Sequence, residues 1–187
     1  MAMTKTKKII LISALEGLAA LAVAALLVFS LWILCSPQTM ATACEKTGNY
    51  SFAVTCAGLK YKYSNDTDDL ARCVQDSILS GKDKYIIEYG ESFLDKDDFE
   101  EVCEKKGGNF KVAVCGSLAL SQYNNAGDIQ KAVATCETGG GASFIKLTVA
   151  VAENGSAEDI NTLKTALSEQ PQSEIITKLL NLLNTGE

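Results

Sequence analysis

Six of the seven cysteines follow the apolar N-terminal stretch, and their spacing is the clearest chemical pattern in the sequence. They form two groups of three, and in each group the first two members lie 12 positions apart: Cys44, Cys56 and Cys73; Cys103, Cys115 and Cys136. Each 12-residue pair straddles a glycine turn between two helical patterns, so antiparallel helices could bring the Cβ atoms within the ~4 Å that a disulfide requires. We expect Cys44–Cys56 and Cys103–Cys115 disulfides, with a Cys115–Cys136 bridge or six buried reduced thiols as the alternatives.

Catalytic and metal-binding residues are not expected. The chain contains no histidine and no CxxC pair, which removes imidazole bases and makes a zinc site a poor interpretation. Carboxylates are abundant, Asp97 and Asp98 for example, but the sequence places no nucleophile or base beside them. We therefore predict no metal, no cofactor and no enzymatic activity.

The charge balance bears on the kind of partner. Outside the first 35 residues there are 14 Lys+Arg and 22 Asp+Glu, a balance of −8. Nucleic-acid binding depends on phosphate neutralisation, so an acidic domain disfavours it. The most acidic stretch, 90–104, lacks the spacing of a calcium-binding loop and is typical of a solvated face. Other proteins are the expected partners.

The N-terminal stretch from 9 to 35 carries one charge, that of Glu16, over 27 residues. A membrane span needs ~20 apolar residues. Lysines precede the stretch, so the positive-inside rule predicts that residues 1–8 are cytoplasmic. We expect a single transmembrane helix over 9–35 in the lipid bilayer of the inner membrane, with a periplasmic or extracellular C-terminal domain. Cleavage after Ala43 is a lesser alternative.

Small residues mark one face of this apolar helix. Ser13, Gly17, Ala20 and Ala24 recur at spacings of four, three and four, with Glu16 beside them. Small faces allow close helix–helix approach in membranes, and an ionisable residue in a span is a functional hypothesis. We expect these five residues to pack against other helices. Burial of the helix in the core of a protein filament, instead of in lipid, remains an alternative.

A repeat of about 30 residues organises the remainder of the chain. An Asp followed by a bulky apolar residue recurs at Asp69, Asp98, Asp128 and Asp159, with spacings of 29, 30 and 31. Asp is a good N-cap, and apolar residues recur at helical spacing. Helices are therefore expected at 49–63, 69–79, 84–94, 98–106, 109–123, 128–138, 142–153, 159–169 and 172–184. The predicted fold is all-α: a linker with a first short helix over 36–48, then an α-solenoid of about four hairpins plus a C-terminal capping helix over 49–187.

One unit, 109–138, resembles a known repeat family. The residues in question are Leu118, Tyr123, Gly127, Asp128, Lys131 and Ala132, in LALSQYNNAGDIQKA. This segment resembles the turn of tetratricopeptide repeats, although the unit here is shorter than theirs. The resemblance implies a scaffold with a concave face that binds proteins or peptides, and it implies no catalytic residues.

Four tyrosines in the first two units are candidate partner-binding residues: Tyr61, Tyr63, Tyr85 and Tyr89. Aromatic residues are enriched in binding faces, and core packing between hairpins is the alternative. Together these patterns predict a non-catalytic, membrane-anchored scaffold or assembly subunit of a larger membrane complex, which binds proteins through its helical repeats. The alternative is a structural subunit of a filament or pilus-like polymer with the apolar helix in its core.

Overall fold

The computed structural model describes residues 17–18, 21–30 and 36–185, and these are helical apart from short connections. The helices from residue 36 onward are α2 (Pro37–Lys46), α3 (Tyr50–Ser64), α4 (Thr67–Ser80), α5 (Asp83–Leu94), α6 (Phe99–Lys106), α7 (Phe110–Ala126), α8 (Ile129–Gly139), η1 (Gly141–Ser143), α9 (Phe144–Asn154), α10 (Ala157–Glu169) and α11 (Glu174–Thr185). The expected all-helical, hairpin-based arrangement is confirmed. Each expected helix is present, with its ends within three residues of the expectation.

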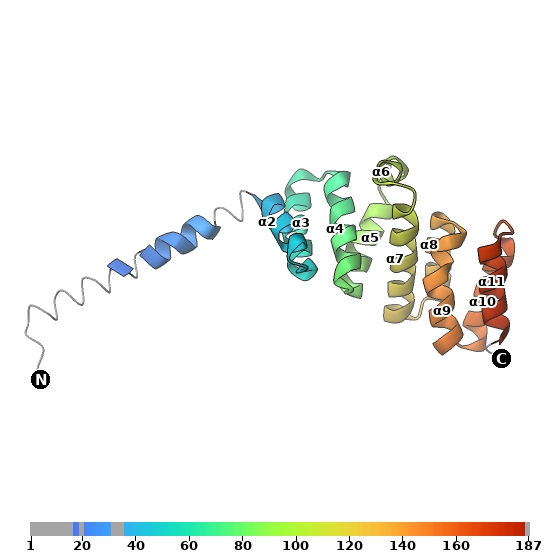
Figure 1. The fold of residues 1–187 in the computed structure, drawn as a ribbon. Coiled ribbons are helices and arrows are strands. Elements are labelled where there is room, and N and C mark those ends of the chain that lie inside the picture. Colours follow the sequence, from blue (N-terminus) through green and yellow to red (C-terminus); the bar gives the residue numbers. More distant parts are fainter. Residues whose placement is uncertain (1–16, 19–20, 31–35, 186–187) are drawn as a thin grey trace, which may run out of the picture.

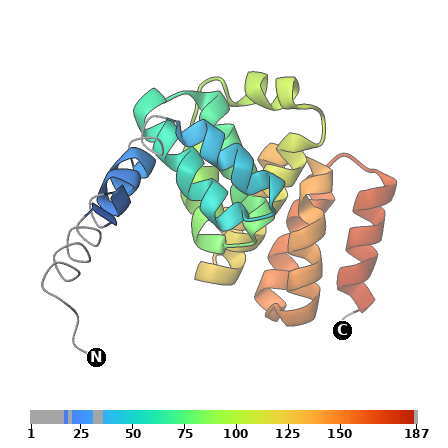
Figure 2. The same cartoon turned by 60° about the vertical axis from the view of Figure 1, so that its left-hand side comes forward.

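Most helices that are consecutive in the chain pack side by side in a row that runs from the N-terminal to the C-terminal end (Figure 1). The pairs α2–α3, α3–α4, α4–α5 and α7–α8 are in contact along the row. Buried apolar residues form two clusters, one from α2 to α7 and one from α7 to α11. Figure 2 shows the same row from a second direction, with α11 at the edge. Each helix therefore buries its apolar face against its neighbours.

Two of the four repeated aspartates form side-chain caps at helix starts, whereas Asp98 is an N-cap without a side-chain bond and Asp69 lies inside α4. Asp128 is the N-cap of α8, where its side chain accepts a hydrogen bond from the Lys131 N–H. Asp159 is the third residue of α10, in a capping box with Ser156 as the N-cap. Both arrangements satisfy backbone N–H groups that would otherwise be free at a helix start.

The expected count of four hairpins plus a capping helix is wrong. Helices α5 and α6 do not stack as a hairpin in the row: α5 packs between α4 and α7, whereas α6 lies above the row against α7 and α4 (Figure 1). Gly90 explains part of this arrangement, because a Cβ there would lie 3.2 Å from the Leu118 side chain of α7. The missing side chain brings α7 close to α5, in the place that α6 was expected to occupy. Helix α2 also packs against α3, and this pair was not among the expected hairpins.

The prediction of a membrane-spanning helix over 9–35, and with it the inner-membrane location, is also wrong. Among the described residues, no helix combines the length and the apolar character needed to cross a bilayer. Residues 21–30 are helical and exposed. Of the residues expected to line the packing face of the predicted helix, Gly17 and Ala24 are exposed, and Ser13, Glu16 and Ala20 lie outside the described residues.

A substitution at Phe93 tests whether this side chain holds α6 against α5 and α7. Its buried ring contacts Phe99 of α6 and Phe110 of α7, with ring centroids 5.0 Å and 6.1 Å away. We expect Phe93→Ala to lower the free energy of unfolding by about 3–5 kcal/mol, because it leaves a cavity among three helices. Phe52→Ala, at a half-exposed ring on α3, should cost about 1 kcal/mol or less. Urea denaturation followed by circular dichroism measures both, and equal losses would contradict this role for Phe93.

Candidate functional site

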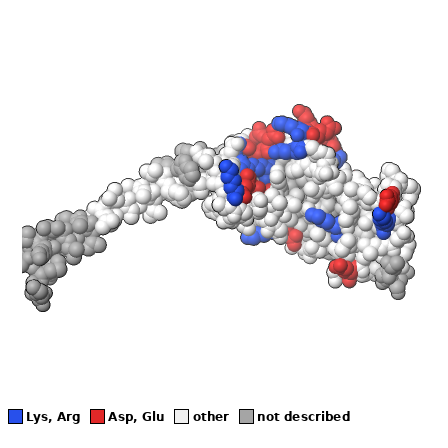
Figure 3. Space-filling model, in the orientation of Figure 1, with Lys and Arg blue, Asp and Glu red and all other residues white. Residues whose placement is uncertain are grey.

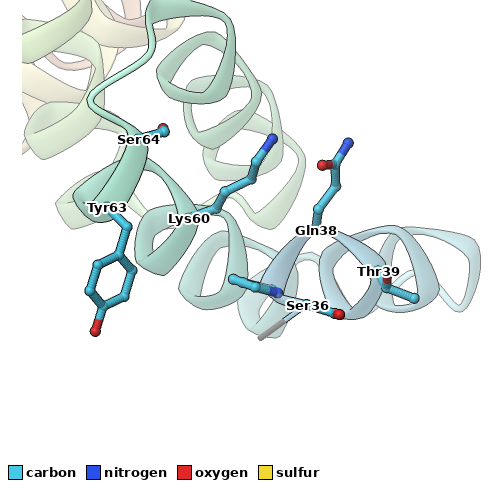
Figure 4. A pocket seen from close by; sticks show the side chains of 7 residues that line it. Ser36, Gln38, Thr39, Lys60, Tyr63 and Ser64 are labelled. Atoms are coloured by element: carbon cyan, nitrogen blue, oxygen red, sulfur yellow. The ribbon is translucent and has the colours of Figure 1, made fainter. Parts of the chain in front are cut away.

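A surface hollow lies at the N-terminal end of the row, where the start of α2 faces the end of α3. It has a volume of about 490 Å³, and its lining residues are Ser36, Pro37, Gln38, Thr39, Lys60, Tyr63 and Ser64. Figure 4 shows that these side chains come from the two facing helices. Tyr63 is 75% exposed, which is unusual for a ring of this size. We name this feature the N-terminal hollow.

One ion pair and one hydrogen bond hold the α3 side of the N-terminal hollow in place. Lys60 Nζ donates to Asp69 Oδ1 over 2.6 Å, and Ser64 Oγ donates to Asp69 Oδ2 over 2.7 Å. These bonds connect α3 to α4 and fix the Lys60 stem, which lines the hollow. The α3 side of the N-terminal hollow is therefore held in place by α4.

A second, polar depression adjoins the N-terminal hollow and shares Gln38 and Lys60 with it. Its volume is about 510 Å³, and its other lining residues are Asp66, Asp68, Asp69, Arg72, Lys105 and Lys106. Lys105 of α6 pairs with Asp68 of α4. Hydrogen bonding to Lys105 lowers the pKa of Asp68, and the same bond raises the pKa of Lys105. Both groups stay charged near neutral pH, so this depression presents an ion pair at the surface.

Charged side chains of both signs gather on the upper face of the view in Figure 3, and much of the remaining visible surface is uncharged. The acidic stretch predicted to be solvated contributes Glu100, Glu101 and Glu104, which are exposed on α6. Lys111 of α7 pairs with Glu100. The surface is therefore mixed in charge.

The four candidate tyrosines do not share one face. Tyr61 is half-buried, with the Lys96 ammonium 5.5 Å from its ring centroid. Tyr85 and Tyr89 stack on α5, with ring centroids 6.5 Å apart. Burial raises the pKa of Tyr89 to about 12, and its ring packs against the first apolar cluster. Tyr63 alone among the four is fully exposed, at the N-terminal hollow.

The disulfide predictions are wrong. All six cysteines from Cys44 to Cys136 are free thiols, and none lies at disulfide distance from another. Five of the six are buried and Cys44 is half-buried. Burial raises the pKa of Cys103 to about 11 and those of Cys73 and Cys115 to about 12. The 12-residue spacing does bring Cys44 near Cys56 and Cys103 near Cys115, but as neighbouring free thiols. Thiols in such positions pack like small apolar side chains.

A buried polar cluster between α2 and α4 was not anticipated. Arg72 Nε donates to Glu45 Oε1 over 2.7 Å, and Arg72 Nη2 donates to Thr42 Oγ1 over 2.7 Å. Asp76, one turn after Arg72, is 2% exposed, and its Oδ2 has no hydrogen-bond partner. The available sequence signal was Arg72, the chain's single arginine, four residues before Asp76 on an expected helix. We name Glu45, Arg72 and Asp76 the α2–α4 cluster.

Neither metal ligands nor relatives assign a function. In the part of the chain that the structure describes, no three His, Cys, Asp or Glu side chains are grouped so that they could hold a metal ion. No family model, curated protein or solved structure matches this chain. The function must therefore be argued from the geometry of the surface.

Thiol labelling tests the burial of the cysteines. In the native chain at pH 8 we expect iodoacetamide to label Cys44 first among the six, because the other five thiols are buried. In denaturant all six should react alike. Peptide mass spectrometry at timed intervals gives the order. Labelling of Cys73 as fast as Cys44, or failure of Cys44 or Cys56 to react after unfolding without reductant, would contradict the structure.

Proposed function

We propose that this chain is a non-catalytic scaffold or assembly subunit that binds other proteins through its helical-hairpin domain. The observation that carries the proposal is the N-terminal hollow, where an exposed tyrosine stands beside a lysine held by its ion pair. Tyrosine supplies a large contact area at a low cost in conformational entropy and is enriched where binding energy concentrates. The charged side chains beside the hollow are already paired with one another, which suits recognition of a partner better than catalysis. The expected partner is a protein, without nucleic acid or metal.

We further propose that the array is of the tetratricopeptide type. Support comes from the unit formed by α7 and α8, in which Leu118 and Ala132 are fully buried. Gly127 ends α7 with φ 65°, a left-handed conformation that glycine adopts without strain, and Asp128 caps α8. The burial of Leu118 and Ala132 and the Gly127–Asp128 turn support the proposal. The displaced α6 departs from a regular array.

Replacement of Tyr63 tests the proposed binding surface. A photo-crosslinking amino acid at position 63, incorporated in the cells that make the protein, should yield an adduct of discrete mass whose partner mass spectrometry identifies. Tyr63→Ala should then weaken binding of that partner at least about tenfold. Phe52→Ala, an exposed ring on the same helix but not in the N-terminal hollow, is the matched control and should bind normally. Equal affinity of the Tyr63→Ala variant would exclude this surface.

A filament or pilus-like polymer is the second candidate, and the helical stretch 21–30 favours it. Leu21, Leu26, Leu27 and Val28 are between 59% and 70% exposed. Residues are 100° apart around a helix, so these four face different directions. A helix that is apolar all round is normally buried. The Ser30 hydroxyl donates a hydrogen bond to the Leu26 carbonyl over 2.7 Å. This hydroxyl would therefore keep a hydrogen-bond partner inside an apolar polymer core.

Sedimentation and electron microscopy of the purified full chain without lipid test the polymer. The wild-type chain should form large assemblies. Leu26→Lys should dissociate them, because it places a charge in the proposed core. Leu79→Lys, at a half-exposed leucine on α4, should leave them intact. A wild-type chain that sediments as a monomer would remove this candidate.

A further inference from the structure

The α2–α4 cluster contains two carboxyl groups and only one cation. Glu45, at 29% side-chain exposure, pairs with Arg72, at 19%. Asp76 lies deeper, and Glu45 is close enough to form a hydrogen bond with it. If both carboxyls are ionised, Arg72 balances one charge and leaves the other buried without compensation, which is costly in a poorly solvated site. A proton on Asp76 would remove the excess charge and supply a donor for Glu45.

We propose that Asp76 holds a proton shared with Glu45, and that loss of this proton loosens α2 from α4, making the N-terminal end of the fold responsive to pH. Helix α2 packs mainly against α3 and has few close backbone neighbours on α4, so side-chain bonds provide its connection to α4. Ala41 is its single fully buried side chain. The bonds from Arg72 to Glu45 and Thr42 therefore form a substantial part of its attachment to α4.

The direction of the pH effect follows from the buried position. Burial, reinforced by the negative charge of Glu45, raises the pKa of Asp76 to about 7. An unfolded or released Asp has a pKa of about 3.9. Between these values the docked state binds a proton that the released state lacks, so docking weakens as pH rises from about 4 to about 7 and then changes no further.

The other titratable groups around Asp76 do not change their charge between about pH 4 and pH 7, so they do not produce this pH effect. Burial raises the pKa values of Cys73 on α4 and Tyr89 on α5 to about 12, and it also raises the pKa of Cys56 on α3. All three stay neutral between pH 4 and 8. On the helices α6 and α7, which also pack against α4, Lys105 and Lys111 pair with Asp68 and Glu100.

Because Gln38 and Thr39 of α2 line the N-terminal hollow, release of α2 would alter that surface as well. The response nevertheless concerns the fold of the chain alone. It can be measured without any partner, so its outcome is independent of the proposed binding function.

Hydrogen–deuterium exchange of the full chain at pH 5 and pH 8 tests the proposal. After correction for intrinsic exchange, the opening constant for the backbone amides of residues 41–46 should rise about tenfold to a hundredfold between the two pH values. The opening constant for the amides of residues 147–151 in α9, which belong to the other apolar cluster, should not change between the two pH values. Unchanged protection of residues 41–46 would overturn the proposal.

Three variants separate the α2–α4 cluster from a general effect of pH. Asp76→Asn keeps the shape and the donor without the titration, so α2 should stay protected at pH 8 as at pH 5. Glu45→Gln removes the neighbouring negative charge but leaves the burial that is the larger cause of the raised pKa, so it should weaken the dependence without abolishing it. Asp68→Asn removes a carboxylate of α4 that pairs with α6, and it should leave the dependence intact. Persistence of the wild-type pH response in Asp76→Asn or Glu45→Gln would overturn the proposal.

Discussion

Burial of apolar side chains between successive helices is the interaction on which the described structure depends. A pair of short helices has too little apolar surface to be stable alone, so each pair relies on the next. The two buried clusters meet at α7, which contributes Val114 and Cys115 to one and Ala119 to the other. Packing around α7 is close enough that a Cβ at Gly116 would lie 2.9 Å from the Ser143 carbonyl oxygen. Helix α7 thus joins the two ends of the row.

Ion pairs then determine how the N-terminal helices lie against one another. Lys60 connects α3 to α4, Arg72 connects α4 to α2, and Lys105 connects α6 to α4. Exposed pairs contribute little to stability, whereas the half-buried Arg72 pair is costly to break. The same pairs shape the N-terminal hollow and its polar neighbour. The proposed binding surface therefore includes residues that these pairs connect.

The helices could be predicted from the sequence because their signals are local. Capping residues, glycine breaks and apolar spacing act within one or two turns, so they survive any tertiary arrangement. The site was only partly predictable. Tyr63 was among the candidates, but its three companions could not be distinguished from it, because exposure depends on the helices that pack over each ring. The disulfide predictions failed for a similar reason: spacing places two cysteines near each other without setting the distance between their sulfur atoms.

By itself, the sequence determined the all-helical content and the approximate helix boundaries, since these follow from hydrogen bonding and apolar periodicity over short distances. Tertiary structure alone decided that α6 leaves the row, that the thiols are buried and unbridged, and that Glu45 and Asp76 share one arginine. Each of these outcomes depends on contacts between residues about 10 to 30 positions apart. Steric fit and the cost of burying charge decide such contacts, and neither can be read from residue spacing.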